Sequence, residues 1–164
     1  MKIEIKIDRA KELLIFDADT GFFYWKEPKG LARARKDGRA GNIGTNGYEY
    51  IRIDGRLILS HRLAFAFAMG RQPDGNIDHA NGDPLDNRPC NLREATQQQN
   101  VWNSRVRKTK RLPVKGVRQI PSGYCASIWV NGRAKHLGVF QSAEEAGAAY
   151  SAEALRLRGE FARS

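Results

Sequence analysis

The sequence predicts an α+β fold in which small β-hairpins precede a unit of two strands and a helix, followed by a three-stranded antiparallel sheet packed on one helix. Three observations predict it. The pairs Asp54-Gly55 and Asn131-Gly132 each separate two alternating segments, as hairpin turns do. Residues 142–145 read Ser-Ala-Glu-Glu, a capping box that opens a helix. The length of 164 residues suits either one ordinary domain or two or three small ones.

The first domain, residues 1–60, is expected to consist of β-hairpins. Residues 14–16 and 22–25 are apolar and flank a turn at residues 19–21. Residues 26–44 are rich in glycine and cations with little periodicity, which predicts a mobile loop. Residues 48–53 alternate with period two, and residues 56–59 form the returning strand of a second hairpin.

The second domain, residues 61–104, is expected to carry the chemistry. Residues 61–69 predict a short buried helix that ends at Gly70. Two strands follow at residues 77–79 and 92–95, joined by an ordered loop. Thr96 with Gln99 three residues later resembles a capping box, so a helix should begin there. Asn100 would lie one turn inside it, against the strand that carries Asp78 and His79.

A basic linker, residues 105–115, contains no acidic residue. It is expected to follow a phosphate backbone, although a solvated connector without defined contacts fits the same composition. The cations proposed to contact DNA here are Arg105, Arg107, Lys108, Lys110 and Arg111.

The last domain, residues 116–164, predicts three strands and a helix that runs from the capping box to Gly159. A two-residue turn sets the register of the hairpin, so Val130 should face Arg133 and Trp129 should face Ala134. One face of the sheet then lies against the helix, and the other carries aromatic and cationic side chains suited to a nucleic-acid groove. A packing role for Trp129 is the alternative. The DNA-contact candidates in this domain are Arg118, Trp129, Arg133, Lys135 and His136.

Charge and composition limit the classes of molecule that the protein is expected to bind. The formal net charge of +10 and the pI of about 9.9 favour a polyanion, here double-stranded DNA rather than a membrane, unless the cations are merely surplus surface charge. The two cysteines, Cys90 and Cys125, form no metal-binding pair and no disulfide framework. We expect no signal peptide and no membrane span, and therefore a cytoplasmic location.

The segment from residue 77 to residue 100, IDHANGDPLDNRPCNLREATQQQN, points to phosphodiester chemistry. Asp78 offers a hard oxygen ligand and His79 an imidazole whose pKa lies near neutrality. Asn100 can add a carbonyl oxygen. A divalent cation held by such groups is well suited to hydrolysis of a phosphodiester.

The ordered pieces IDHANGD, NRPCNL and TQQQN resemble the HNH endonuclease family, in the branch typical of phage and homing enzymes. The resemblance implies a ββα-metal core in which Asp78 and Asn100 bind the metal and His79 is the general base. Asn91 would match the middle residue of the motif, which orients the base. The last motif position is Asn100 where many relatives carry histidine. The oxygen ligands favour Mg²⁺, with Mn²⁺ as a substitute.

Three nearby residues are open to two interpretations each. Asn87 in Asn-Arg-Pro is expected to form a turn rather than to act in catalysis. His61 heads HRLAFAF and is expected to pack, with a supporting contact to the site as the alternative. Arg93 is either a phosphate contact or a partner in a salt bridge on the strand surface.

The segments GVRQIPSGY, NGRAKHLGVFQSAEEAGAAY and LRLRGEFA resemble the plant ethylene-response-factor DNA-binding domain. In this chain Ile120 and Ala134 stand where plant relatives often have arginine, so backbone-dominated binding is expected. The sequence thus predicts a metal-dependent DNA endonuclease with an appended DNA-binding domain, a monomer or weak homodimer that nicks. The alternatives are a DNA-binding transcriptional regulator with an inactive nuclease motif, and an RNA-directed nuclease or packaging protein.

Overall fold

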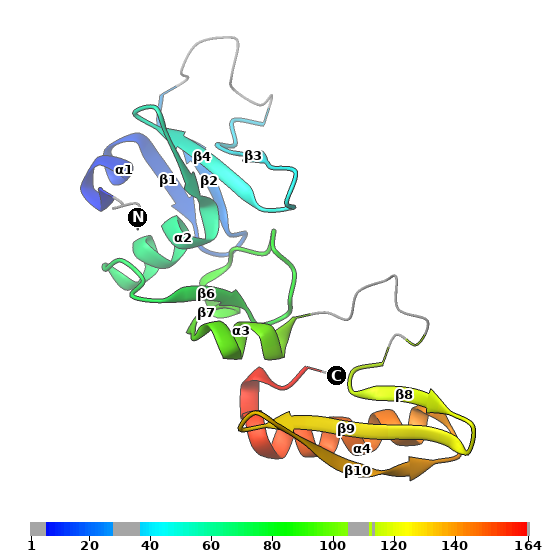
Figure 1. Ribbon diagram of the computed structural model, residues 1–164. Coiled ribbons are helices and arrows are strands. Elements are labelled where there is room, and N and C mark those ends of the chain that lie inside the picture. Colours follow the sequence, from blue (N-terminus) through cyan, green and yellow to red (C-terminus); the bar gives the residue numbers. More distant parts are fainter. Residues whose placement is uncertain (1–5, 28–36, 105–111, 113, 164) are drawn as a thin grey trace. The chain divides into compact units, whose positions relative to one another are not determined.

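The computed structural model describes residues 6–27, 37–104, 112 and 114–163. Its chain forms two compact units, Met1–Thr96 and Gln97–Ser164, and each combines helices with small antiparallel sheets (Figure 1). The predicted α+β class is confirmed. The elements of the first unit are α1 (Ile7–Leu13), β1 (Leu14–Asp17), β2 (Phe22–Trp25), β3 (Asn42–Ile43), β4 (Glu49–Ile53), β5 (Arg56–Leu59), α2 (Ser60–Met69), β6 (Asn76–His79), η1 (Pro89–Asn91) and β7 (Leu92–Ala95). The second unit contains α3 (Gln97–Asn103), β8 (Val117–Ile120), β9 (Gly123–Val130), β10 (Arg133–Phe140), α4 (Ala143–Arg158) and η2 (Gly159–Phe161).

Both hairpins of the first unit form where the sequence predicts them. β1 pairs with β2, and β4 pairs with β5 in a register that sets Ile53 opposite Arg56. Asp54 and Gly55 both have positive φ angles, 45° and 82°, as the two central residues of a tight turn between twisted strands require.

Two features of this unit depart from the sequence prediction. Helix α1 precedes the first hairpin, where no helix was expected. The prediction of a mobile loop over residues 26–44 is wrong for its described end, because β3 pairs with β4 and Arg39 forms a bridge with Tyr24. Residues 28–36 of that loop lie outside the described residues.

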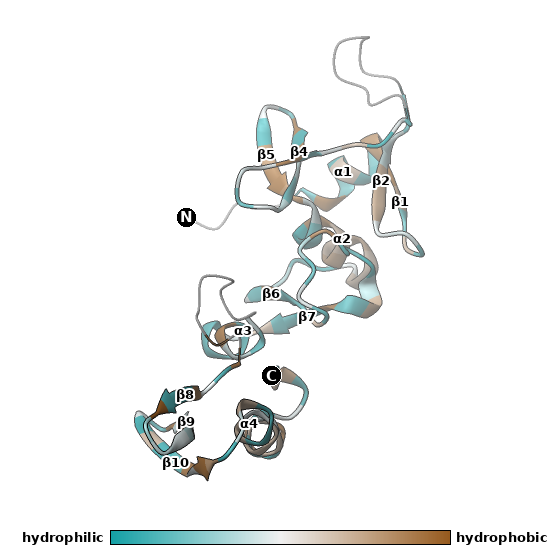
Figure 2. Ribbon diagram, turned by 90° about the vertical axis from the view of Figure 1, so that its right-hand side faces the viewer, coloured by the Kyte–Doolittle hydropathy of each residue, from teal (hydrophilic) through white to brown (hydrophobic). Residues whose placement is uncertain are grey.

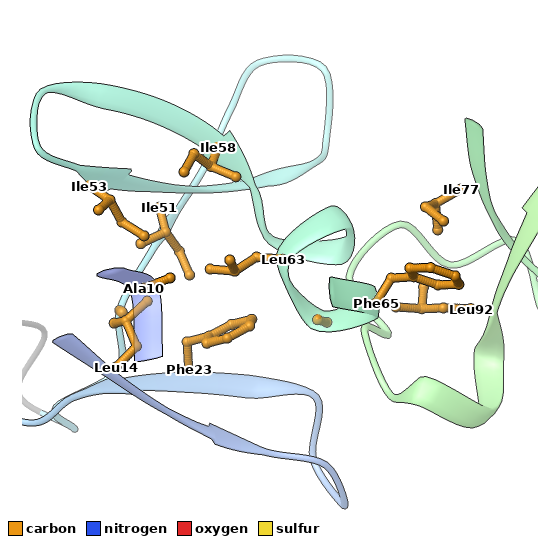
Figure 3. Close-up of a cluster of buried hydrophobic side chains, with 12 residues drawn as sticks. Ala10, Leu14, Phe23, Ile51, Ile53, Ile58, Leu63, Phe65, Ile77 and Leu92 are labelled. Atoms are coloured by element: carbon orange, nitrogen blue, oxygen red, sulfur yellow. The ribbon is translucent and has the colours of Figure 1, made fainter. Parts of the chain in front are cut away.

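One hydrophobic core joins the hairpins to the strands that follow them. Figure 3 shows Leu63 of α2 directed toward Phe23 and Ile51, while Phe65 of the same helix lies beside Ile77 and Leu92. Because α2 contributes buried side chains in both directions, residues 1–60 and the strands β6 and β7 do not form separate domains. The structural boundary falls after Thr96, not at residue 60 or residue 104.

Strands β6 and β7 pair in antiparallel fashion and carry polar side chains along much of their length, which colours them largely teal in Figure 2. Arg62 of α2 donates hydrogen bonds to the carbonyl oxygens of Gly75 (2.9 Å) and Pro73 (3.3 Å). The helix therefore fixes the chain as it enters β6, and both of the expected strands and the loop between them are confirmed.

The second unit contains a three-stranded sheet of order β10-β9-β8. Arg133 faces Val130 and Ala134 faces Trp129, which confirms the predicted register. Helix α4 begins at a capping box in which Ser142 Oγ accepts a hydrogen bond from the Glu145 amide (3.1 Å). The core of this unit contains Ile128, Tyr150 and Ala154, which are buried between the helix and the sheet. Within the described residues, none of the helices combines the length and the apolar character that crossing a membrane requires.

Candidate active site and DNA-binding face

Asp78 and His79 form the end of β6 and are both buried, with only 4% and 5% of their surfaces exposed. Ionisable side chains are rarely buried unless they are paired. In the β6–β7 register Asp78 stands opposite Arg93 and His79 opposite Leu92. The strand pairing therefore holds an acid and an imidazole side by side in a protected position.

The imidazole of His79 is held by Asn87. Its Nε2 donates a hydrogen bond to Asn87 Oδ1 over 3.2 Å, and Asn87 is only 1% exposed. Because an amide oxygen only accepts hydrogen bonds, Nε2 carries the proton of the neutral ring and the basic lone pair is on Nδ1. Burial lowers the pKa of His79, while the hydrogen bond that the ring donates to Asn87 and the nearby carboxylates act to raise it. The ring is therefore neutral at neutral pH, as a general base must be.

Asn87 is the residue that the sequence interpretation undervalued. It was expected to form a turn, whereas its side chain contacts the imidazole directly. An asparagine before Arg-Pro is typical of turns. Only its burial against His79, eight positions earlier in the chain, distinguishes Asn87 from an ordinary turn asparagine.

Asn91 organises the loop between β6 and β7. Its Oδ1 accepts a hydrogen bond from the Asn81 amide (2.9 Å), and its Nδ2 donates to Asn81 Oδ1 (3.0 Å) and to the Asp86 carbonyl oxygen (2.8 Å). Asn91 thus fixes both ends of the loop that carries Asn87. The side-chain contact to the imidazole comes from Asn87, so the role predicted for Asn91 in orienting the base stays a prediction.

Arg93 forms an ion pair with Asp78. Its Nε donates to Asp78 Oδ2 over 2.9 Å, and Nη2 lies 2.9 Å from the same oxygen. The two side chains face each other across the β6–β7 pair and are 17% and 5% exposed. Of the two interpretations of Arg93, the salt bridge is the one that the structure contains, and its partner is the predicted metal ligand.

His61 lies against the base. Its ring centroid is 5.2 Å from that of His79 and 5.3 Å from that of Tyr48, both in edge-to-face geometry. Burial, together with the charges of His79 and Arg62, lowers the pKa of His61 to about 3. A second neutral aromatic ring therefore packs on the catalytic candidate, which combines the packing role with the supporting contact.

The buried state of His61 predicts a pH dependence of folding. Its pKa is near 6.5 in the unfolded chain and about 3 in the folded protein, so the unfolded state binds the extra proton between these values. Stability must then fall as the pH drops from 6.5 toward 3, by roughly 2 kcal/mol between pH 6.5 and pH 5 for this group alone. His61→Phe keeps an aromatic ring and removes the titration. Urea unfolding at pH 7 and pH 5 should show a smaller loss for the variant, and equal losses would contradict the assignment.

The other predicted ligand, Asn100, lies in helix α3, which begins at Gln97 as expected. This helix clusters with the second unit, whereas Asp78 belongs to the first, so the predicted meeting of the two side chains stays a prediction. The linker cations proposed to bind DNA lie outside the described residues, namely Arg105, Arg107, Lys108, Lys110 and Arg111.

The sheet of the second unit exposes the predicted face. Trp129 is 66% exposed, and Arg118 and His136 are exposed on the same face, where the register sets them opposite Cys125 and Ser127. His136 Nδ1 lies 3.5 Å from Cys125 Sγ on the same face. A large aromatic ring left in solvent on a face that also carries basic side chains is typical of a surface that binds nucleic acid.

Lys135 and Arg133 belong to the opposite side of β10. Lys135 is paired in register with the buried Ile128, and its ammonium forms an ion pair with Glu153 of α4 at 2.9 Å. Arg133 stands opposite Val130, two positions from Lys135 along the strand. Side chains two apart on a strand share a face, so these two cations lie on the helix side of the sheet and not beside Trp129.

Comparison with known proteins finds a family match for the segment that contains the buried Asp78–His79 pair. Residues 59–102 match the family model described as HNH endonuclease. This segment is similar to the HNH endonuclease family. It spans α2, β6, β7 and most of α3, which are the elements that position Asp78, His79 and Asn100.

One sequence relative and one solved structure that the comparisons found also carry the HNH description. An uncharacterized HNH endonuclease of Acanthamoeba polyphaga mimivirus is 35% identical over 123 residues, which cover 73% of this chain and 63% of the relative. The chain therefore spans less than two thirds of that relative's length. A solved structure titled "DNA binding and cleavage by the HNH homing endonuclease I-HmuI" aligns at 22% identity with a TM-score of 0.41, covering 89% of this chain and 85% of that chain.

Proposed function

We propose that this chain is a metal-dependent DNA endonuclease of the phage or homing type. The observation that carries the proposal is the buried pair at the end of β6, in which Asp78 lies beside a neutral His79 whose ring is fixed by Asn87. This pair lies within the HNH module. A merely structural histidine would not need an adjacent buried carboxylate.

His79 is proposed to act as the general base. With Nε2 committed to Asn87, its Nδ1 lone pair takes a proton from the attacking water. Asn87 keeps the ring in this tautomer, and Asn91 keeps Asn87 in place through the loop. His61 and Tyr48 pack around the ring, which limits its rotation and excludes water from its sides.

The donor set fits a divalent metal ion. Asp78 and Asn100 are proposed to hold it through a carboxylate and an amide oxygen, both hard ligands preferred by Mg²⁺ and also accepted by Mn²⁺. Such an ion polarises the phosphate and stabilises the charge that develops on the leaving 3′ oxygen. Within the described residues, no group of three or more His, Cys, Asp or Glu side chains is placed to hold a metal. The remaining ligands would therefore come from the phosphate and water.

Arg93 has a place in this scheme through its ion pair with Asp78. The pair compensates the buried carboxylate when no cation is near. We propose that the guanidinium then contacts the phosphate of bound DNA, since that anion would take over as its partner.

The sheet face of the second unit is proposed to bind double-stranded DNA through Arg118, Trp129 and His136, as in an ethylene-response-factor-like domain. The linker cations would add contacts to the phosphate backbone. One HNH module per chain supplies one cut, so a monomer would nick, and a double-strand break would require a dimer or two separate events.

The proposal predicts strict metal dependence. Supercoiled plasmid incubated with the protein and Mg²⁺ or Mn²⁺ should convert to open-circle DNA, and a chelator should stop the reaction. An agarose gel resolves the forms. Plasmid and phage DNA that are bound but remain intact with every metal would overturn the endonuclease proposal and favour a DNA-binding regulator. Cleavage of RNA alone would favour the RNA-directed alternative.

A further inference from the structure

Helix α3 belongs to the HNH module by sequence but to the second unit by its contacts. The family match extends to residue 102, whereas the boundary between the two compact units precedes the helix, after Thr96. With seven residues, α3 is too short to be stable alone in water. Its position must therefore be set by what packs against it.

The side chain of Trp102 is held by Arg158, the last residue of α4. The guanidinium carbon lies 5.1 Å from the centroid of the Trp102 ring and 5.8 Å from that of Tyr150. Arg158 Nη1 also donates a hydrogen bond to Tyr150 Oη over 3.0 Å. Because Tyr150 belongs to the core of the sheet domain, Arg158 links that core directly to α3 through a cation–π contact.

A second contact holds the end of the helix. Lys115 Nζ donates a hydrogen bond over 2.7 Å to the carbonyl oxygen of Trp102, one of the last four carbonyls of α3, which lack a partner within the helix. Desolvation and the neighbouring Arg158 and Arg163 lower the pKa of Lys115 to about 8. The C-terminal segment η2 also packs on α3.

We propose that the sheet domain positions the metal-binding helix of the nuclease, with Trp102, Lys115 and Arg158 as the clamp. Asn100 lies two residues before Trp102, and successive helical residues are about 100° apart, so the two side chains leave the helix on opposite sides. The clamp thus holds one side of α3 and leaves Asn100 directed away from it. The domain serves catalysis by fixing a metal ligand, in addition to binding DNA. This inference rests on the proposed role of Asn100.

Hydrogen exchange tests the clamp without reference to activity. In the metal-free protein of residues 1–164, Arg158→Ala should raise exchange in a peptide covering residues 97–104 about two- to fivefold, as expected for loss of one cation–π contact. The matched control is Arg156→Ala, which removes an exposed arginine two residues away that pairs with Glu153. Exchange in β9 reports whether the sheet domain stays folded. If Arg158→Ala also exposes β9, Trp102→Leu provides the same test from the helix side.

Cleavage assays then connect the clamp to the metal. Arg158→Ala should need a higher Mg²⁺ concentration for half-maximal nicking while its affinity for DNA is unchanged, and Arg156→Ala should match the wild type in both. Unchanged exchange in α3 for both Arg158→Ala and Trp102→Leu would overturn the clamp. Absence of cleavage by every protein, including the wild type, would overturn the proposed function and leave the exchange result standing.

Discussion

Replacement of His79 by alanine is expected to reduce the rate of plasmid nicking by about 10²- to 10⁴-fold, the usual contribution of a general base. The expectation follows from a ring that is buried, neutral and fixed by Asn87, with its lone pair on Nδ1. His61, whose ring packs beside that of His79, cannot take over this task, because its pKa is already about 3. Single-turnover nicking at saturating protein measures the effect.

The two proposed activities can be separated with a second variant. His79→Ala should retard DNA in a gel as well as the wild type, since its defect lies in the chemical step. Trp129→Ala, on the exposed sheet face, should weaken retardation and leave the rate at saturating protein nearly unchanged. Full nicking activity in the His79→Ala protein would remove the histidine from the mechanism.

Replacement of Gly21 by alanine is expected to lower nicking on the order of 10²-fold, the loss that a displacement of about 1 Å at an active site can cause. Gly21 ends the turn between β1 and β2 with φ of 75°. A Cβ atom at this position would lie 2.6 Å from the Arg88 nitrogen and 2.7 Å from the Asn87 carbonyl carbon. Both neighbours are backbone atoms, so the loop must shift, and Asn87 would carry its hydrogen bond away from His79.

Gly47 supplies the matched control. It has a similar φ of 83°, but a Cβ atom there would meet nothing within 4 Å. Gly47→Ala therefore pays only the left-handed backbone strain, roughly 1–2 kcal/mol, and should nick at the wild-type rate. Both variants should show similar losses in thermal stability from strain alone, with an extra loss for Gly21→Ala. If the two variants nick equally well, the hairpin turn does not support the catalytic loop.

The Gly21 contact gives the N-terminal hairpins a defined part in the site. Their shared core with α2 and with Leu92 fixes the turn against the segment that carries Asn87. The hairpins therefore belong to the structural support of the candidate site, in agreement with a compact unit that extends through β7.

Elements with local signals could be predicted from the sequence. Asp54-Gly55 and Asn131-Gly132 adopt the positive φ angles of hairpin turns, and Ser142 caps α4. These local structures depend on backbone preferences and hydrogen bonds within a few residues, so the neighbouring residues in the sequence are enough to predict them. The strand pair β6–β7 and the Asp78–His79 candidate could also be predicted, because the motif is recognised from the order of its residues in the sequence.

Contacts between distant residues decided the rest. The sequence determined the α+β class, the hairpin registers, the two ends of α4 and the choice of Asp78 and His79 as site candidates. The tertiary structure decided that Asn87 touches the base, that Arg93 pairs with Asp78, that Lys135 turns to Glu153, and that α3 joins the sheet domain. Each of these contacts depends on which buried polar or charged groups find a hydrogen-bond or ion-pair partner once the chain is packed. The pairing of buried groups is a property of the whole fold rather than of any local segment.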